Sequence, residues 1–238
     1  MIPFYTLITL ILLLILGLAI FYYRLRHKLK KASKQRTEHA QSLREIVESG
    51  GINITDQNGN TPLILAIRYD FPEIINLLIQ QNPNLQHANH NGNTALHFAS
   101  ILAHETQQQQ IITTLIKAGA LLETTNNSGQ TPTWMAAAAN NLTNLQTLVQ
   151  HGASLQLADK NGHTPLMAAV LAKSYETVNW IASQPINHNT ADKQNHTAHD
   201  LCLIHWPEIQ TQWQKNKNSK KATPQVQAFH QIRTALEA

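Results

Sequence analysis

A short motif recurs at a nearly fixed interval along most of this 238-residue chain. Each copy places a polar residue, a turn residue and a threonine in the same order, and the threonines stand at positions 61, 94, 131, 164 and 197. The intervals between them are 33, 37, 33 and 33 residues. Such a period is typical of chains built from one small unit that cannot bury its apolar side alone, so that successive units must stack.

Each position of the motif has a physical reason. An Asn-Gly pair supplies the positive φ that a tight hairpin turn needs, and Ser-Gly or a lone Asn can replace it. The threonine that follows is a good N-cap, because its hydroxyl accepts a hydrogen bond from a free amide of the first helical turn. Proline at the next position costs no hydrogen bond there. The motif therefore predicts a hairpin and then a helix that begins after Thr61, Thr94, Thr131, Thr164 and Thr197.

A second helix is expected in each unit, over residues 72–81, 107–117, 142–150 and 175–183. The spacing of Ile74, Leu77 and Leu78 predicts one buried face for the first of these helices. The four extra residues of the long interval fit around residues 104–110, between the two helices of that unit. Residues 42–50 are expected to form the second helix of an N-terminal capping unit.

These features together resemble the ankyrin repeat, whose 33-residue units carry Asp-x-x-Gly-x-Thr-Pro-Leu-His-x-Ala-Ala. The resemblance covers residues 40–214 and implies an all-α ankyrin-repeat solenoid, with a capping helix and about five β-hairpin/helix-turn-helix units. Only His97 keeps the histidine of the motif, which Ile64, Trp134 and Met167 replace. The last unit has His199-Asp200 where Leu-His is expected, and we expect it to have a polar outer face, as a C-terminal cap needs.

The resemblance also implies a function, because the concave face of such a solenoid usually binds another protein. Carried onto this chain, the candidate partner-binding residues are Asn60, Leu65, Arg68, Tyr69, Asn93, Phe98, Gln130, Trp134, Met135, His163 and Lys173. Ile101 is a further position of a first helix that is expected to face the groove, and packing between repeats is an equal alternative for Leu65, Phe98 and Ile101. Arg68, Tyr69 and Trp134 are favoured, because these residue types dominate the energetics of protein interfaces.

The net charge of +4 averages regions of opposite sign. Residues 37–214 hold 6 basic and 13 acidic side chains, a net charge of −7, and the remaining basic residues flank them. The central region would repel phosphate, which argues against a nucleic-acid partner. Its charge hints at a partner with a basic patch, although its amide-rich surface suits a neutral partner equally well.

The N-terminal segment has the composition of a membrane anchor. Residues 2–23 contain no charged side chain and would span about 33 Å as a helix. Seven basic residues follow between Arg24 and Arg36. The sequence therefore predicts a transmembrane helix over 2–23, a basic juxtamembrane linker over 24–39, and a single-pass protein of the cell inner membrane whose repeats are cytoplasmic. A cleaved secretory signal is the alternative, but no basic residue precedes the apolar run and no small-x-small cleavage site follows it.

The chain shows no pattern typical of catalysis, and we expect no catalytic residue, cofactor, metal or small-molecule substrate. A single cysteine excludes a disulfide framework, and no Gly-rich phosphate loop occurs. His196, His199, Cys202 and His205 are spaced by three, so neighbouring pairs could share a metal ligand site, but all four cannot converge on one straight helix. A metal at these four residues stays open, beside the simpler interpretation of a degenerate terminal repeat.

Residues 215–238 read as a basic linker and a short amphipathic helix, because Val226, Phe229, Ile232 and Leu236 recur at helical spacing. This helix could pack on the last repeat, lie on an anionic membrane surface or bind a partner. The whole chain is interpreted as a membrane-tethered interaction module that binds a protein through its concave groove. The alternative is an inhibitor or immunity protein that sequesters a cognate enzyme or toxin.

Overall fold

The computed structural model describes residues 34–102, 107–206, 211 and 223–237. The chain divides into two compact units, residues 1–50 and 51–238. The described part of the first unit is a helix over residues 34–48. The boundary predicted at residue 40 falls inside this helix. An ion pair between Lys34 and Glu38 at 3.8 Å and a hydrogen bond from Gln41 to Glu45 at 3.0 Å both have the (i, i+4) spacing that favours a continuous helix there.

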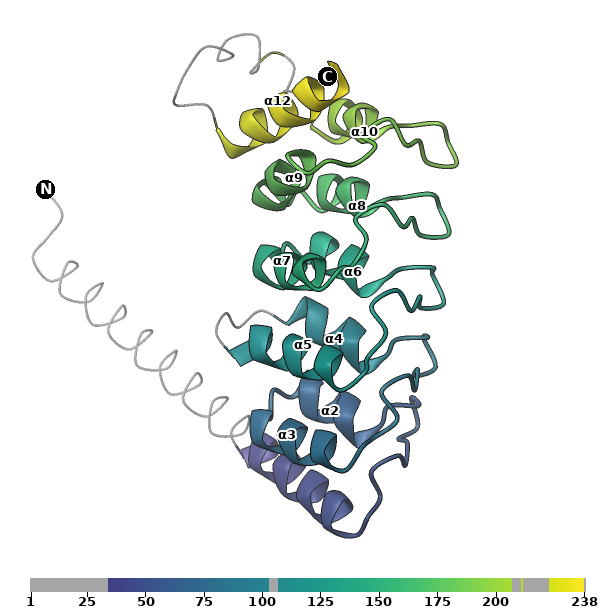
Figure 1. Ribbon diagram of the computed structural model, residues 1–238, viewed down its shortest axis with the longest axis vertical. Coiled ribbons are helices and arrows are strands. Elements are labelled where there is room, and N and C mark those ends of the chain that lie inside the picture. Colours follow the sequence, from purple (N-terminus) through teal and green to yellow (C-terminus); the bar gives the residue numbers. More distant parts are fainter. Residues whose placement is uncertain (1–33, 103–106, 207–210, 212–222, 238) are drawn as a thin grey trace, which may run out of the picture. The chain divides into compact units, whose positions relative to one another are not determined.

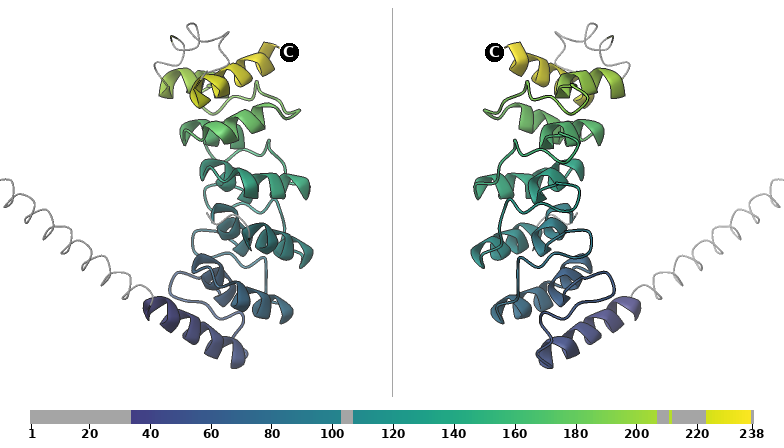
Figure 2. Two further views of the ribbon diagram at one scale, coloured as in Figure 1. Left: turned by 90° about the vertical axis from the view of Figure 1, so that its left-hand side faces the viewer. Right: turned by 90° about the vertical axis from the view of Figure 1, so that its right-hand side faces the viewer.

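The second unit is a stack of hairpin-helix-helix repeats, with the hairpins on one side and the helices in layers (Figure 1). The first helices of successive repeats, called inner helices here, pack against one another: α2 (Pro62–Arg68), α4 (Ala95–Ile101), α6 (Pro132–Ala138), α8 (Pro165–Leu171) and α10 (Ala198–His205). The second helices, called outer helices, form a parallel layer: α3 (Pro72–Gln80), α5 (Gln107–Lys117), α7 (Leu142–Gln150) and α9 (Tyr175–Ala182). Two side views show this layering (Figure 2). The predicted ankyrin-type solenoid is confirmed for these repeats.

The threonines start the inner helices as their chemistry requires. The hydroxyl oxygens of Thr61, Thr131 and Thr164 accept hydrogen bonds from the backbone N–H groups three residues later, at 3.1–3.4 Å. Five residues after each threonine stands a fully buried small side chain, and these residues are Ala66, Ala99, Ala136, Ala169 and Cys202. A small side chain at this position lets neighbouring layers approach closely. Cys202 therefore occupies the alanine position of the last repeat.

The outer helices bury two residues per repeat completely, and the first pair is Ile75 and Leu78. The equivalent residues of the next three repeats are Ile112 and Leu115, Leu145 and Leu148, and Val178 and Ile181, all fully buried. The predicted buried face of α3 was wrong in one residue, since Leu77 is 48% exposed.

The C-terminal helix α12 (Pro224–Glu237) packs against α9 and α10 (Figure 1). Val226, Ala228, Phe229 and Ile232 are buried in this contact, and the Phe229 ring lies 5.1 Å from the His199 ring of α10. Of the three alternatives for this segment, packing on the last repeat is confirmed. The helix covers apolar surface that a further repeat would otherwise cover.

The predicted location in the cell inner membrane is corrected by the structure. Within the described residues, no helix combines the length and the apolar character needed to cross a bilayer. A spanning helix needs about 20 apolar residues, whereas the longest described helices, 34–48 and α12, are shorter and carry charged side chains. Residues 2–23, on which the prediction of a single-pass anchor depended, lie outside the described part of the chain.

Candidate functional site

The hairpins stack on one another through a regular network of hydrogen bonds. In each hairpin, an Asp or Asn side-chain oxygen accepts two backbone N–H groups of its own turn, as Asp56 does from Asn58 and Asn60 at 2.8 Å. Between hairpins, a backbone N–H donates to a carbonyl of the preceding turn, beginning with His90 to Asn58 at 3.0 Å. The same bond recurs from Asn127 to Asn91, from Lys160 to Ser128 and from Lys193 to Asn161.

The predicted contact residues that follow the turn glycines belong largely to this network. Asn60 is 1% exposed, and its side-chain Oδ1 accepts a hydrogen bond from the side-chain amide of Asn89 at 2.9 Å. Asn93 is half-buried and accepts one from Asn126 at 3.0 Å. Gln130 accepts one from Asn126 within its own hairpin at 3.0 Å, and the His163 ring lies near two carboxylates. These side chains hold the hairpins in register, and Asn60 offers no surface to a partner.

Trp134 has a structural role of the same kind. It stands three residues after its threonine, at the position of His97, and its indole Nε1 donates to the carbonyl of His163 in the next repeat at 2.9 Å. The Nε2 of His97 contacts the equivalent carbonyl, that of Gln130, at 3.0 Å. Because the backbone N–H of Thr94 donates to Nδ1 of His97, Nε2 carries the proton of this neutral ring and donates. Trp134 thus makes the bond between repeats that His97 makes one repeat earlier.

Asp200 fills this position in the last repeat. Its carboxylate accepts from the backbone N–H and the hydroxyl of Thr197, at 2.9 and 2.7 Å, as the ring of His97 does with Thr94. The hydrogen bonds from Thr197 lower the pKa of Asp200 and outweigh burial, which acts to raise it, and the charges of His199 and His196 lower it further. A terminal repeat needs only this local bond, which explains the departure from the motif.

The most exposed positions of the inner helices lie seven and eight residues after each threonine. Tyr69 is 41% exposed, Ile101 37% and Ile204 52%. Since successive inner helices are neighbours, these positions form one row, called the inner-helix row here. Its members are Arg68, Tyr69, Ile101, Leu102, Ala138, Ala139, Leu171, Ala172, Ile204 and His205. Arg68 is the one permanently charged side chain in this row.

The remaining predicted contact residues border the row. Leu65, Phe98 and Met135 are half-buried, four residues after their threonines, so they contribute both to packing and to the surface. The Arg68 guanidinium lies over the Phe98 ring at 5.4 Å and links two neighbouring repeats. Lys173 is exposed just beyond the row and adopts a positive φ of 58°.

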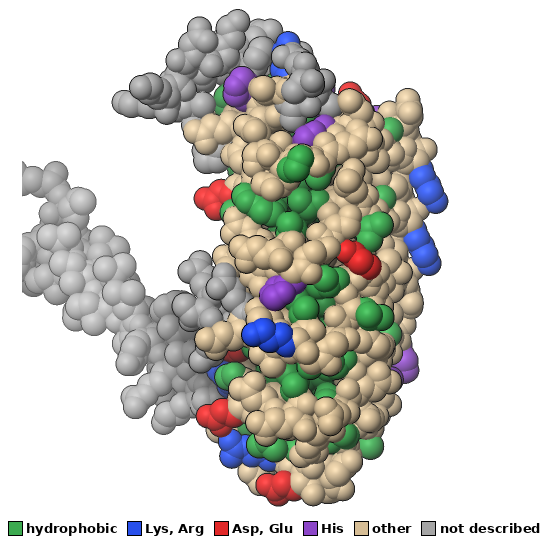
Figure 3. Space-filling model, in the orientation of Figure 1, with side chains coloured by type: hydrophobic (Ala, Val, Ile, Leu, Met, Phe, Trp, Pro, Cys, Tyr) green, Lys and Arg blue, Asp and Glu red, His purple; other side chains and the backbone are tan. Residues whose placement is uncertain are grey.

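The acidic side chains of the repeats are largely engaged within the molecule. Asp56, Asp159 and Asp192 hold their own hairpin turns, and Glu123 accepts the backbone N–H of Ser154 at 2.7 Å. Figure 3 shows few charged side chains on the face that it draws. The net negative charge of the repeats therefore does not create an acidic patch in the inner-helix row, and it gives little support to a basic partner.

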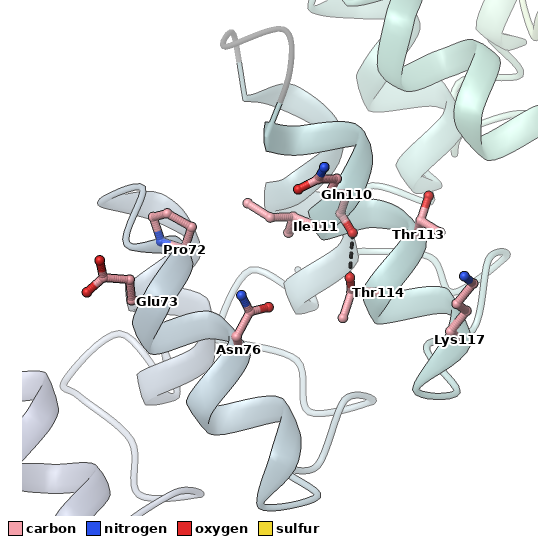
Figure 4. A pocket seen from close by; sticks show the side chains of 8 residues that line it. All are labelled: Pro72, Glu73, Asn76, Gln110, Ile111, Thr113, Thr114 and Lys117. Atoms are coloured by element: carbon pink, nitrogen blue, oxygen red, sulfur yellow. Dashed lines mark hydrogen bonds between the residues drawn. The ribbon is translucent and has the colours of Figure 1, made fainter.

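A separate cavity of about 770 Å³ lies between α3 and α5, on the outer helices (Figure 4). Amide and hydroxyl groups dominate its lining, and Thr114 donates to the Gln110 carbonyl at 2.6 Å. The lining residues are Pro72, Glu73, Asn76, Gln110, Ile111, Thr113, Thr114 and Lys117. None of them was predicted as a site residue, since this cavity belongs to the layer opposite the inner helices.

The four residues considered for a metal do not converge. Within the described residues, no group of three or more His, Cys, Asp or Glu side chains is placed to hold a metal ion. Cys202 is fully buried at the alanine position, and burial raises the pKa of its thiol. His199 packs on Phe229, and His196 lies beside Asp192 at 3.6 Å. A degenerate terminal repeat accounts for this cluster.

Leu171 and Ile204 of the inner-helix row were missed by the sequence reasoning. The signal was present, because both stand seven residues after a threonine, as Arg68 and Ile101 do. Counting the same offset in every repeat finds them. Choosing residues by type instead favoured Trp134, whose indole is engaged between repeats.

Comparison with known proteins supports the fold. A family model described as ankyrin repeats (3 copies) matches residues 29–126 and 101–192. The human ankyrin repeat domain-containing protein 63 is 28% identical over 108 residues, which are 45% of this chain and 28% of that protein. The match thus spans little more than a quarter of the length of this curated relative. The family model covers well over half of the chain and agrees with the layered repeats of the structure, so the chain belongs to the ankyrin-repeat family.

Proposed function

We propose that this protein binds a partner protein through the inner-helix row and the neighbouring hairpins. Ankyrin repeats are protein-interaction modules and are generally not enzymes. The observation that carries the proposal is the row itself: Tyr69 and Ile101, at the ends of the neighbouring helices α2 and α4, are 41% and 37% exposed, and Ile204, on α10 at the far end of the row, is 52% exposed. Apolar surface arranged in this way on a folded protein marks an interaction site.

The row also indicates how the partner is recognised. Nine of its ten members carry no permanent charge, and the guanidinium of the tenth, Arg68, is stacked on Phe98. Burial of apolar side chains then supplies most of the binding energy. We expect the affinity for the partner to change by less than about threefold when the salt concentration rises tenfold, because screening weakens mainly interactions between exposed charges.

A capture experiment with matched variants tests the proposal. The immobilised protein is incubated with an extract of its source cells, the captured proteins are quantified, and the most enriched one is purified for affinity measurement. Ile101→Asp places a charge in the row and should reduce affinity at least about tenfold. Leu77→Asp is the control, since Leu77 is exposed to a similar degree on the outer helix α3. Equal affinity for the two variants would refute the proposed surface.

A further inference from the structure

The side chains that link neighbouring hairpins change their chemistry along the array. The first two links are neutral amide hydrogen bonds, from Asn89 to Asn60 at 2.9 Å and from Asn126 to Asn93 at 3.0 Å. Neither partner gains or loses a proton in the physiological range. In the last two repeats, histidine stands in the place of asparagine, at His163 and His196.

Imidazoles and carboxylates alternate across the hairpins of repeats four and five. His163 Nδ1 lies 3.7 Å from Asp159 Oδ2 in its own hairpin, and its Nε2 lies 3.5 Å from Asp192 Oδ2 in the next one. His196 Nδ1 lies 3.6 Å from the same Asp192 oxygen. The two carboxylates are 2–3% exposed, whereas the His163 ring is 19% and the His196 ring 41% exposed. Solvent protons can therefore reach both rings, and the charges they face are sheltered from water.

The Asp192 carboxylate keeps its charge over the range in which histidine titrates. Burial acts to raise the pKa of Asp192, but the backbone N–H groups of His196 and Gln194 and the charges of the two histidines outweigh it, so the pKa is lowered. The other charged groups nearby are Asp200, with which His196 also interacts, and the hairpin residues Lys160 and Lys193. The helices α6 and α8, which begin beside these hairpins, contain no ionisable side chain.

We infer that protonation of His163 tightens the attachment of the fifth hairpin to the fourth, and that protonation of His196 tightens the fifth hairpin itself. A proton on His163 places a cation 3.5 Å from the sheltered Asp192 carboxylate of the next hairpin, which strengthens the link between the two hairpins. A proton on His196 places a cation 3.6 Å from the same carboxylate within one hairpin. The coupling of the last repeat to the array therefore increases as the pH falls from about 7.5 to about 5.5, while the amide links of the first repeats stay constant. Because each repeat contacts only its neighbours, this response is confined to the C-terminal end of the array.

Hydrogen exchange on the full-length protein tests this inference. Protection of the backbone amides in segment 191–196, corrected for the intrinsic effect of pH, should be about fivefold greater at pH 5.5 than at pH 7.5, the effect of one partly sheltered ion pair. Segment 55–60, whose link is an amide, serves as the internal reference. The double variant His163→Asn, His196→Asn should lose the difference. Asparagine is tolerated structurally, because Asn60 and Asn93 occupy the same place in earlier hairpins.

A matched histidine variant separates this mechanism from a general effect of acid. His151 is exposed at the end of α7, so His151→Asn should keep the full pH response of segment 191–196. The inference is overturned if the double variant keeps the response, or if protection of this segment in the unmodified protein stays constant or falls on acidification.

Discussion

Gly92 stands where the next hairpin leaves no room for a side chain. Its φ is 78°, and a Cβ there would lie 2.5 Å from the backbone nitrogen of Asn127. Gly92→Ala should therefore lower the free energy of unfolding by about 2 kcal/mol or more, from left-handed strain and displacement of the neighbouring hairpin together. Urea unfolding followed by circular dichroism measures this change.

Asn195 supplies the control for this prediction. It occupies the same turn position in the fifth hairpin with a φ of 63°, and no further hairpin follows it among the described residues. Asn195→Gly should change the free energy of unfolding by less than about 1 kcal/mol, since only the intrinsic preference for positive φ differs. A loss as large as that of Gly92→Ala would show that crowding between hairpins is not the cause.

His97 should make the stability of the protein depend on pH. Burial lowers the pKa of its imidazole, and the hydrogen-bonding backbone groups of Gln130 and Thr124 oppose this only in part. The unfolded chain therefore takes up the proton first, and the contribution of His97 is complete above pH 6.5 and is lost as the pH falls towards the folded pKa. The difference in unfolding free energy between the unmodified protein and His97→Ile should shrink from pH 7.5 to pH 5. A constant or growing difference would contradict the prediction.

Roles that depend on the local backbone were easier to predict from the sequence than the distant groups that a side chain contacts. The capping threonines and turn glycines were predictable, because their roles depend on the local backbone alone. The role of Trp134 was not, since its Nε1 is satisfied by a carbonyl 29 residues away. An indole suits an interface and an interior equally well, and only the stacking of the next repeat decides between them.

At the scale of the elements, α4 ends differently from the other inner helices. The helices α2, α6 and α8 are each followed by a residue with positive φ, and backbone N–H groups just after the helix donate to its last carbonyls, as at Asp70 and Asn140. The chain instead leaves α4 extended at Leu102. The Asn144 amide of α7 then donates to the carbonyls of Ala99 and Ser100, at 3.1 and 3.3 Å. The insertion of this repeat is thus compensated by a side chain of the next one.

Removing that amide should loosen the second and third repeats. Asn144→Ala leaves buried carbonyls without a donor and should lower the free energy of unfolding by about 1–3 kcal/mol. Asn76→Ala is the matched control, because Asn76 is exposed on the outer helix α3 and should change stability by less than about 0.5 kcal/mol. Equal effects in urea unfolding would show that the hydrogen bonds of Asn144 are not the cause of the loss, because helix propensity favours alanine over asparagine in both variants.

The sequence predicted the hairpins and the paired helices closely, because turn, cap and period agree in each repeat. It could not decide where α12 packs, since an amphipathic helix shows only that one face is covered. The sequence also could not decide whether Ile75 or Leu77 belongs to the buried face of α3. Both residues are apolar, and they are only two positions apart. The net charge was equally uninformative about the partner, because the carboxylates of Asp56, Asp159 and Asp192 accept hydrogen bonds from the backbone of their own turns.

At the scale of the whole molecule, a stack of repeats opens locally, since each repeat is stabilised only by its neighbours. Cys202 reports on the C-terminal end of this stack, because it is fully buried and the unreactive thiol form is favoured there. A thiol reagent should label it only when α12 or α10 opens. Phe229→Ala removes a buried ring from α12 and should accelerate labelling of the folded protein about 100-fold or more.

A core truncation at the other end distinguishes local from global opening. Leu63 is 1% exposed in α2 of the first repeat, and three repeats separate it from the fifth repeat, which contains Cys202. Leu63→Ala should cost the first repeat about 2–5 kcal/mol and yet change the labelling rate of Cys202 by less than about threefold. If both variants accelerate labelling equally, the repeats unfold as one cooperative unit, and the last repeat then cannot respond to pH independently of the first.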